Sequence, residues 1–211
     1  MKRHENQFLL VSGRVVCAAG VKRRGIPLIR LLPRQAVFLR DDNRGGVDKH
    51  RFAGAFRQTW ERMPRWARAT ILRHWQPLPS GPRIEIEWEI GAAGMCRSNG
   101  EWLVFEAQVV DAMPLHLLET LIAHELAHVA IAALPAAAYG RLPAFYQRLV
   151  LPEEQFAMID QVEEATMIDE VEEAAVCWFT ETWGFEAESL KEWLMGSFSV
   201  PRVYRYCGPC G

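Results

Sequence analysis

The segment His124-Glu125-Leu126-Ala127-His128 brings two imidazoles and a carboxylate together in five consecutive residues. In a helix, residues four apart lie on one face about one turn apart, so both imidazoles can reach a single metal ion. Glu125 lies about 100° further round the helix, where its carboxylate can reach a metal-bound water without ligating the metal. Zinc lowers the pKa of such a water towards neutrality, and the carboxylate can take its proton as it attacks a carbonyl. The segment therefore predicts zinc-dependent hydrolysis with Glu125 as general base.

An apolar helix is expected to carry these three side chains. Pro114 favours a helix start and Pro135 a helix end, and the apolar residues between them recur at helical spacing. The residues that flank the segment, 121–123 and 129–130, carry no charge. A charge-free helix with two histidines and a glutamate is hard to explain as a solvated face. The alternative is a core helix whose histidines are satisfied by neighbouring groups.

This segment resembles the active-site helix of the zincin metallopeptidases, which carry the same pattern of two histidines and a glutamate. The resemblance covers residues 84–184 and implies an α+β, zincin-like domain with a small mixed sheet. In that family the helix follows a strand at the edge of the cleft, to which substrate adds as a further strand. Trp102–Val110 is the strand in the matching position. The resemblance implies a zinc metalloendopeptidase with one zinc ion per chain and a peptide or protein substrate.

The third zinc ligand distinguishes the subclasses of this family. Metzincins continue the motif to a glycine and a third histidine, but Ile131 and Leu134 occupy those positions here. SprT-like peptidases are similar in layout and take their third ligand from a downstream histidine, and no histidine follows His128 in this chain. A downstream carboxylate is left, which is the gluzincin arrangement.

A later helical stretch, 167–179, offers four carboxylates: Asp169, Glu170, Glu172 and Glu173. At about 100° per residue, Glu172 falls next to the apolar face, whereas Glu173 and Glu170 fall on the outer side. Gluzincins often carry a ligand glutamate followed three residues later by alanine, which Glu172 and Ala175 match, although the family's usual Asp or Asn after that alanine is Val176 here. We expect His124, His128 and Glu172 to bind zinc, with Glu173 as the second choice and the other carboxylates solvated.

The overall composition is that of a soluble globular protein. Of the 211 residues, 50% are hydrophobic and 24% are charged, which excludes a disordered or collagen-like chain. No apolar run approaches the ~20 residues of a membrane span. The segment Phe8–Gly20 is short and broken by Arg14, so it fits neither a span nor a signal peptide. We expect a cytoplasmic protein without a membrane partner.

The charges are divided unevenly along the chain. Residues 1–83 contain 18 Lys and Arg against 5 Asp and Glu, whereas residues 84–211 contain 6 against 21. This asymmetry predicts either a basic surface for nucleic acid or a basic half that is solvated or docked on the acidic half. Tryptophans and arginines alternate in 48–76, and such residues can stack on single-stranded nucleic acid. The alternative function is therefore a nucleic-acid-associated protein whose peptidase domain is regulated or inactive, with weak binding through the basic half.

The proline-rich segment 77–82 cannot continue a helix and is taken as the boundary between two regions. Residues 1–82 predict a basic N-terminal extension, and residues 83–211 predict the metallopeptidase domain with a short tail. The expected strands are at 7–20, 26–40, 83–90 and 102–110, with a loop at 91–100. The expected helices are at 48–63, 64–76, 114–135, 153–182 and 187–195.

Five cysteines are too few and too scattered for a disulfide framework, so we expect reduced thiols. Cys207 and Cys210 have the spacing of a thioredoxin motif, but we expect an ordinary turn or, alternatively, part of a second metal site. A structural metal site closed by a fourth ligand such as Cys177 is a further alternative. The sequence does not select an oxyanion-stabilising residue among the four tyrosines, Tyr139, Tyr146, Tyr204 and Tyr206.

Overall fold

A computed structural model describes residues 47–79, 81–135, 138 and 164–197, together with the segments 8–11, 14–17, 22–23, 25–32 and 35–40. The described residues form eight strands and six helices. The chain is of the α+β class, which confirms that prediction.

Two sheets contain the strands. The first is antiparallel and joins β1 (Phe8–Val11), β2 (Arg14–Cys17) and β3 (Lys22–Arg23). The second has the order β4-β5-β6-β8-β7, formed by β4 (Gly25–Leu32), β5 (Gln35–Arg40), β6 (Arg83–Glu87), β7 (Gly94–Arg97) and β8 (Trp102–Glu106). Strands β5, β6 and β8 are parallel, and the outer strands β4 and β7 are antiparallel to their neighbours. This second sheet is therefore mixed, as expected.

The edge strand next to β8 was missed by the sequence analysis, which assigned 91–100 to a loop. Strand β7 lies inside that segment and forms a hairpin with β8, and it is β7 and not β8 that ends the sheet. The turn of the hairpin has left-handed φ angles at Ser98, Asn99 and Gly100, which asparagine and glycine tolerate well. All four residues of β7 are half-buried. Because burial does not alternate along it, this short strand lacks the two-residue period that identifies a strand in a sequence.

The strand after this turn is also shorter than expected. The prediction of a strand over 102–110 is wrong for its second half, because Ala107–Ala112 form helix α3. Arg51 of α1 holds the end of this helix. Its guanidinium donates to the carbonyl oxygens of Val110, in the last turn of α3, and of Met113, which follows it. Carbonyl groups at the end of a helix lack partners within it, so Arg51 satisfies two of them.

The other helices lie within or close to the expected ones, and the part of the helix expected at 153–163 lies outside the described residues. These helices are α1 (Lys49–Arg62), α2 (Arg65–Trp75), α4 (Leu115–Ala132), α7 (Glu164–Thr182) and α8 (Ala187–Ser197). The carboxylate of Asp48 caps α1 by accepting from the backbone N–H groups of His50 and Arg51, both at 3.0 Å. Gly184, with a φ of 84°, follows the end of α7, as glycine often does at a helix terminus.

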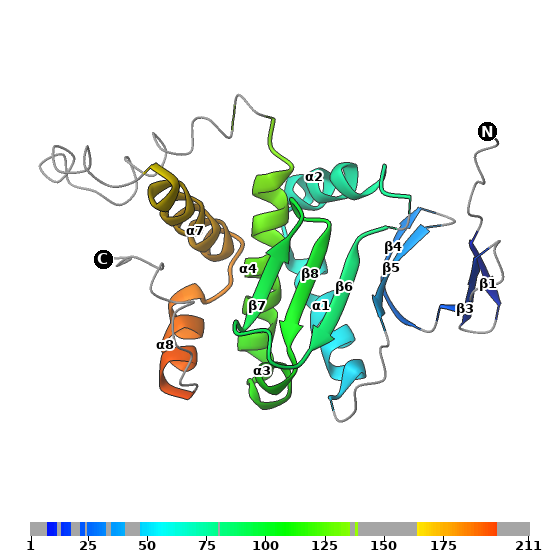
Figure 1. The fold of residues 1–211 in the computed structure, drawn as a ribbon, viewed down its shortest axis with the longest axis horizontal. Helices are drawn as coiled ribbons and strands as arrows, with labels where there is room; N and C mark the ends of the chain where they lie inside the picture. Colours follow the sequence, from blue (N-terminus) through cyan, green and yellow to red (C-terminus); the bar gives the residue numbers. More distant parts are fainter. Residues whose placement is uncertain are drawn as a thin grey trace, which may run out of the picture.

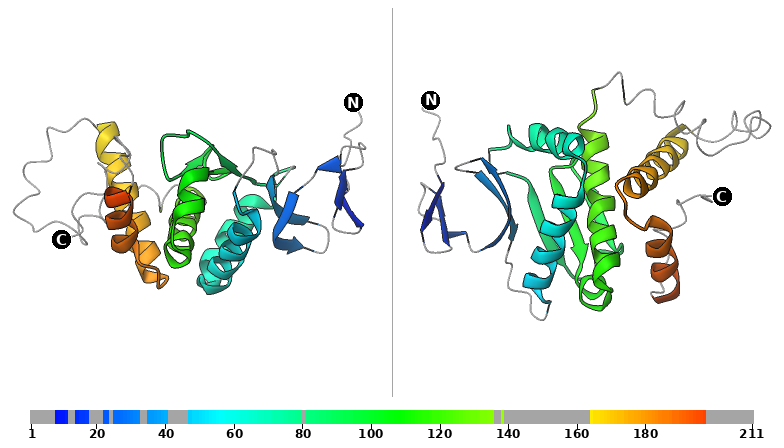
Figure 2. Two further views of the ribbon diagram at one scale, coloured as in Figure 1. Left: turned by 90° about the horizontal axis from the view of Figure 1, so that it is seen from below. Right: turned by 180° about the vertical axis from the view of Figure 1, so that it is seen from behind.

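Helices α1 and α4 cover one face of the five-stranded sheet, and α7 and α8 lie on the side of α4 away from α1 (Figures 1 and 2). Helix α4 is therefore the central element, in contact with the sheet, with α1 and α2, and with α7 and α8. No helix in the described part of the chain lies on the other face of the sheet.

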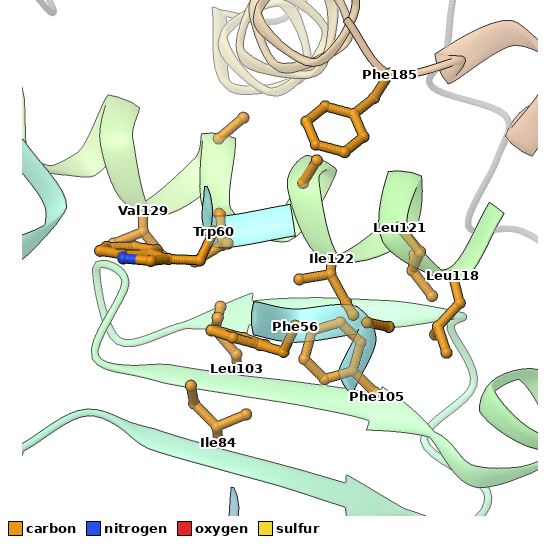
Figure 3. Close-up of a cluster of buried hydrophobic side chains, with 14 of the residues drawn as sticks. Phe56, Trp60, Ile84, Leu103, Phe105, Leu118, Leu121, Ile122, Val129 and Phe185 are labelled. Atoms are coloured by element: carbon orange, nitrogen blue, oxygen red, sulfur yellow. The ribbon is translucent and has the colours of Figure 1, made fainter. Parts of the chain in front are cut away.

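One hydrophobic core joins these layers (Figure 3). It extends across the boundary that we expected at residue 82, since β5 pairs with β6 through Leu39 and Ile84. The residues of 1–82 that belong to this core therefore pack as one unit with those that follow. Figure 3 labels part of this cluster: Phe56, Trp60, Ile84, Leu103, Phe105, Leu118, Leu121, Ile122, Val129 and Phe185.

Helix α4 is also, among the described residues, the one helix long and apolar enough to cross a membrane by length and composition. In the structure 78% of this stretch is buried inside the protein. A helix in the core of a soluble protein meets the same two criteria, so this observation is weak evidence and assigns no membrane location.

Trp75 of α2 fastens the β7–β8 hairpin to the helices. Its indole Nε1 donates to the carbonyl oxygen of Gly100 at 2.7 Å, and its ring stacks on Trp60 with centroids 6.2 Å apart. The side chain is fully buried, so replacing the indole leaves a buried carbonyl without a donor.

We expect Trp75→Phe to lower the free energy of unfolding by roughly 1–3 kcal/mol, measured by urea denaturation. Trp88→Phe is the matched control, since Trp88 is exposed and its replacement should change this free energy by less than about 0.5 kcal/mol. Equal effects of the two substitutions would contradict the role assigned to Trp75.

Candidate metal centre

Helix α4 carries the predicted site residues on a buried surface. His124 and Glu125 are 6% and 4% exposed, and the side chain of His128 is 14% exposed. This part of α4 lies between β7 on one side and α7 on the other (Figure 1). Imidazoles and carboxylates in such a place need hydrogen bonds, opposite charges or a metal ion to offset their loss of hydration.

Helix α7 supplies two carboxylates to the same place. Its residues Val171, Ala175 and Val176 are buried and belong to the core, which fixes α7 against α4. Glu172 and Glu173 lie between these buried residues along the helix, with side chains 28% and 27% exposed. The packing of α7 thus carries these carboxylates to the histidines of α4, more than forty residues earlier in the chain.

Three of these side chains could together hold a metal ion. One ligand atom from each of His124, His128 and Glu173 lies within 4.8 Å of the others. The Glu173 carboxylate is 3.4 Å from Nε2 of His124 and 3.1 Å from Nε2 of His128. Ligands placed tetrahedrally around zinc at about 2.0–2.1 Å are separated from one another by about 3.3–3.4 Å. The observed separations are therefore close to those of a zinc ligand set.

Glu172 has a different place from the one expected. Its Oε1 lies 3.0 Å from Nδ1 of His128, the ring nitrogen that points away from Glu173. A carboxylate on the far nitrogen of a ligating histidine fixes the orientation of the ring and increases its basicity. The structure therefore places Glu173 with the two histidines and Glu172 behind His128, which reverses our order of preference. An angular step of about 100° per residue gives the direction in which a side chain leaves the helix. It does not give the final position of a flexible carboxylate group.

The charges of this group are strongly coupled. Burial alone would lower the pKa values of His124 and His128, but their hydrogen bonds with the carboxylates outweigh it and raise both, that of His128 well above its ordinary value. Burial would raise the pKa of Glu173, yet its hydrogen bonds to both histidines lower it well below the usual range. The arrangement thus favours an ionised Glu173 between the two imidazoles.

Glu125 is buried beside this group but does not belong to it. Burial raises the pKa of its carboxyl group, against the lowering effect of the two histidines. No hydrogen-bond partner is found for its Oε2 within the described part of the chain. Glu125 therefore lies next to the three donors with one oxygen that none of the described groups engages.

Cys96 on β7 also faces this region, although the sequence analysis singled out Cys177 as a possible fourth ligand. Burial, together with the negative charges of Glu125, Glu172 and Glu173, raises the pKa of the Cys96 thiol. Neither Cys96 nor Cys177 is a member of the group of potential metal ligands. Within the described residues this group has three members, so a tetrahedral ion held by them would keep a fourth position for water or substrate.

The remaining candidates from the sequence lie outside the described residues or side chains. These are the side chains of Asp169 and Glu170, the four tyrosines considered for the oxyanion, and Cys207 with Cys210.

No known protein family, curated protein or solved structure matches this chain.

The two glutamates of α7 should differ in their effect on metal binding. Glu172→Ala removes the partner of a ligating histidine and should weaken zinc binding about 10- to 100-fold. Glu173→Ala removes a ligand and should weaken it further, as should His124→Ala and His128→Ala. Competition with a chromogenic zinc chelator measures these affinities. If Glu172→Ala has the larger effect, Glu172 and not Glu173 is the ligand.

The pH dependence of stability should differ between the metal-free and zinc-loaded protein. Ion pairs of the protonated histidines with Glu173 stabilise the metal-free protein fully between about pH 4.5 and 6.5, and this contribution is lost as pH rises through the raised pKa values of the histidines or falls towards the lowered pKa of Glu173. Zinc needs neutral imidazoles, so its stabilisation increases as pH rises through the pKa values of the histidines. We expect the difference in Tm between the two forms to widen as pH rises above about 6, measured by thermal denaturation.

The protein with both His124→Ala and His128→Ala is the control for this experiment, since zinc should not change its Tm at any pH. A difference that narrows with rising pH in the unsubstituted protein would contradict the assignment.

Proposed function

We propose that this protein is a zinc-dependent peptidase of the zincin kind, with one zinc ion held by His124, His128 and Glu173 and with Glu125 as general base. The observation that carries the proposal is the convergence of two imidazoles and a carboxylate at ligand separations, directly beside a buried carboxylate with an unengaged oxygen.

The donor set supports zinc as the metal. Two imidazole nitrogens and one carboxylate oxygen are the three protein ligands of gluzincin sites, whose fourth position is open. A structural zinc site would instead be closed by four protein ligands, usually with cysteine among them. Bound there, zinc would lower the pKa of a coordinated water towards neutrality and polarise a substrate carbonyl.

Glu125 is suited to the proton transfers of this reaction. The carboxylate would accept a proton from the attacking water and later deliver it to the leaving amine. A general base works best when its pKa is near the operating pH, and burial shifts the pKa of Glu125 upwards in that direction. Its unengaged Oε2 leaves one oxygen available for the exchanged proton.

Strand β7 supports a peptide as the substrate. It ends the five-stranded sheet, so no described strand pairs with the backbone groups along its outer edge. An extended peptide can add to such an edge through main-chain hydrogen bonds. Because β7 contacts α4 at the level of Glu125, a peptide added there would lie beside the proposed zinc site.

Glu125→Gln tests the catalytic role directly, since it keeps the size of the side chain and removes the base. It should leave the zinc content at about one ion per chain and reduce hydrolysis by about a hundredfold or more. Zinc is measured by elemental analysis and hydrolysis with a library of internally quenched peptides. Glu61→Gln, on the exposed side of α1, is the control and should retain full activity. A Glu125→Gln protein that cleaves at the unsubstituted rate would refute the mechanism.

A further inference from the structure

We propose that Gly94 is a positioning residue for Glu125: the absence of a side chain at this position of the edge strand provides the space in which the carboxylate of the general base lies. The catalytic consequence rests on the proposed function, whereas the contact itself can be tested without any assay of hydrolysis.

The space next to Gly94 is filled by one side chain. A Cβ atom built on Gly94 would lie 2.5 Å from Oε1 of Glu125 and 2.9 Å from its Cγ and Cδ atoms. These three atoms are the nearest ones, and all belong to Glu125. Such separations are below those that Cβ atoms show in proteins, so any other residue at 94 would have to displace the carboxylate or the strand.

The backbone at Gly94 does not itself require glycine. Positive φ angles occur at Gly81, Gly91, Gly100 and Gly184, but not at Gly94. An alanine could therefore adopt the conformation of this strand residue without strain. The requirement for glycine at 94 comes from the carboxylate of Glu125 alone.

The strand is not free to move away from the helix. Gly94 pairs with Phe105 of β8, and at the other end of the hairpin a Cβ on Gly100 would lie 3.1 Å from the Cα and Cγ1 atoms of Val129. The hairpin thus approaches α4 closely at Glu125 and at Val129, one helical turn apart. Since the bond from Trp75 also holds Gly100, an added methyl group at 94 would push the carboxylate rather than the strand.

Apart from the attraction of His124 and His128, packing holds the carboxylate in place. Glu125 is almost fully buried, and its Oε2 has no hydrogen-bond partner among the described residues. Its position therefore depends on the surfaces that surround it, and β7 is the nearest of these. No described strand pairs with the outer edge of β7, where a peptide could add, so this contact sets the distance between the general base and the strand on which the substrate would lie.

Gly94→Ala is the test, with Gly54→Ala as the matched control because a Cβ on Gly54 meets nothing within 4 Å. Both substitutions are made in the full-length protein and in the Glu125→Ala variant. Tm and zinc content are measured for each, and kcat and KM for the variants that retain Glu125. The Gly54 variants should match their parent proteins, or be slightly more stable, since alanine favours a helix more than glycine.

We expect Gly94→Ala to lower Tm by roughly 3–10 °C, as overpacking does in a domain of this size, and to leave Tm within about 1 °C of its parent when Glu125 is alanine. It should reduce kcat about tenfold or more, with KM and zinc content nearly unchanged. Three results would overturn the proposal: a similar Tm loss with and without Glu125, failure to fold in both backgrounds, or no change in either Tm or kcat. Absence of hydrolysis in the unsubstituted protein would refute the proposed function. The comparison of the Tm loss with and without Glu125 would still show whether Gly94 contacts the Glu125 side chain.

Discussion

The pairing of buried charges between α4 and α7 is the constraint on which this structure depends. His124 and Glu125 are buried and His128 and Glu173 are partly buried, and an isolated charge in a buried place costs several kcal/mol. Once α7 packs on α4, the imidazoles of α4 lose water and need the carboxylates of α7 as partners. The docking of α7 therefore has two causes: burial of apolar residues such as Val171, and neutralisation of the charges on α4.

A bound metal ion, as proposed, would also offset the burial of these groups. Without metal, Glu173 lies between the two imidazoles, Glu172 pairs with Nδ1 of His128, and burial raises the pKa of Glu125 beside them. A divalent cation among the same donors would interact favourably with these carboxylates and would need only neutral imidazoles. Glu172 would then orient the imidazole of His128 through its Nδ1, whereas the adjacent Glu173 would bind the ion. The hairpin completes the site from the other side, where Gly94 leaves room for the carboxylate of Glu125.

Much of this arrangement could be predicted from the sequence, and the exceptions have physical reasons. Helix α4 is long, apolar and bounded by prolines, so its extent and the common face of His124 and His128 follow from its periodicity. The choice between Glu172 and Glu173 does not follow from the sequence. The two residues are neighbours on one helix, and the carboxylate that reaches both histidines is determined by how α7 packs against α4. Strand β7 has no periodic pattern and is defined by pairing with β8. The core that crosses residue 82 results from strand pairing distant in sequence, which a proline-rich segment does not reveal.

The central claim is that the ligands of the metal are two imidazoles and a carboxylate, and X-ray absorption at the zinc edge of the purified, zinc-loaded protein tests it most directly. The structure predicts a first shell of nitrogen and oxygen at about 2.0–2.1 Å, with the scattering pattern of two imidazoles and without sulfur. Zinc bound by Cys96, Cys177 or the cysteines of the tail would instead show sulfur at about 2.3 Å. A shell that contains sulfur, or that lacks the signal of two imidazoles, would contradict the assignment of His124, His128 and Glu173 as the metal site.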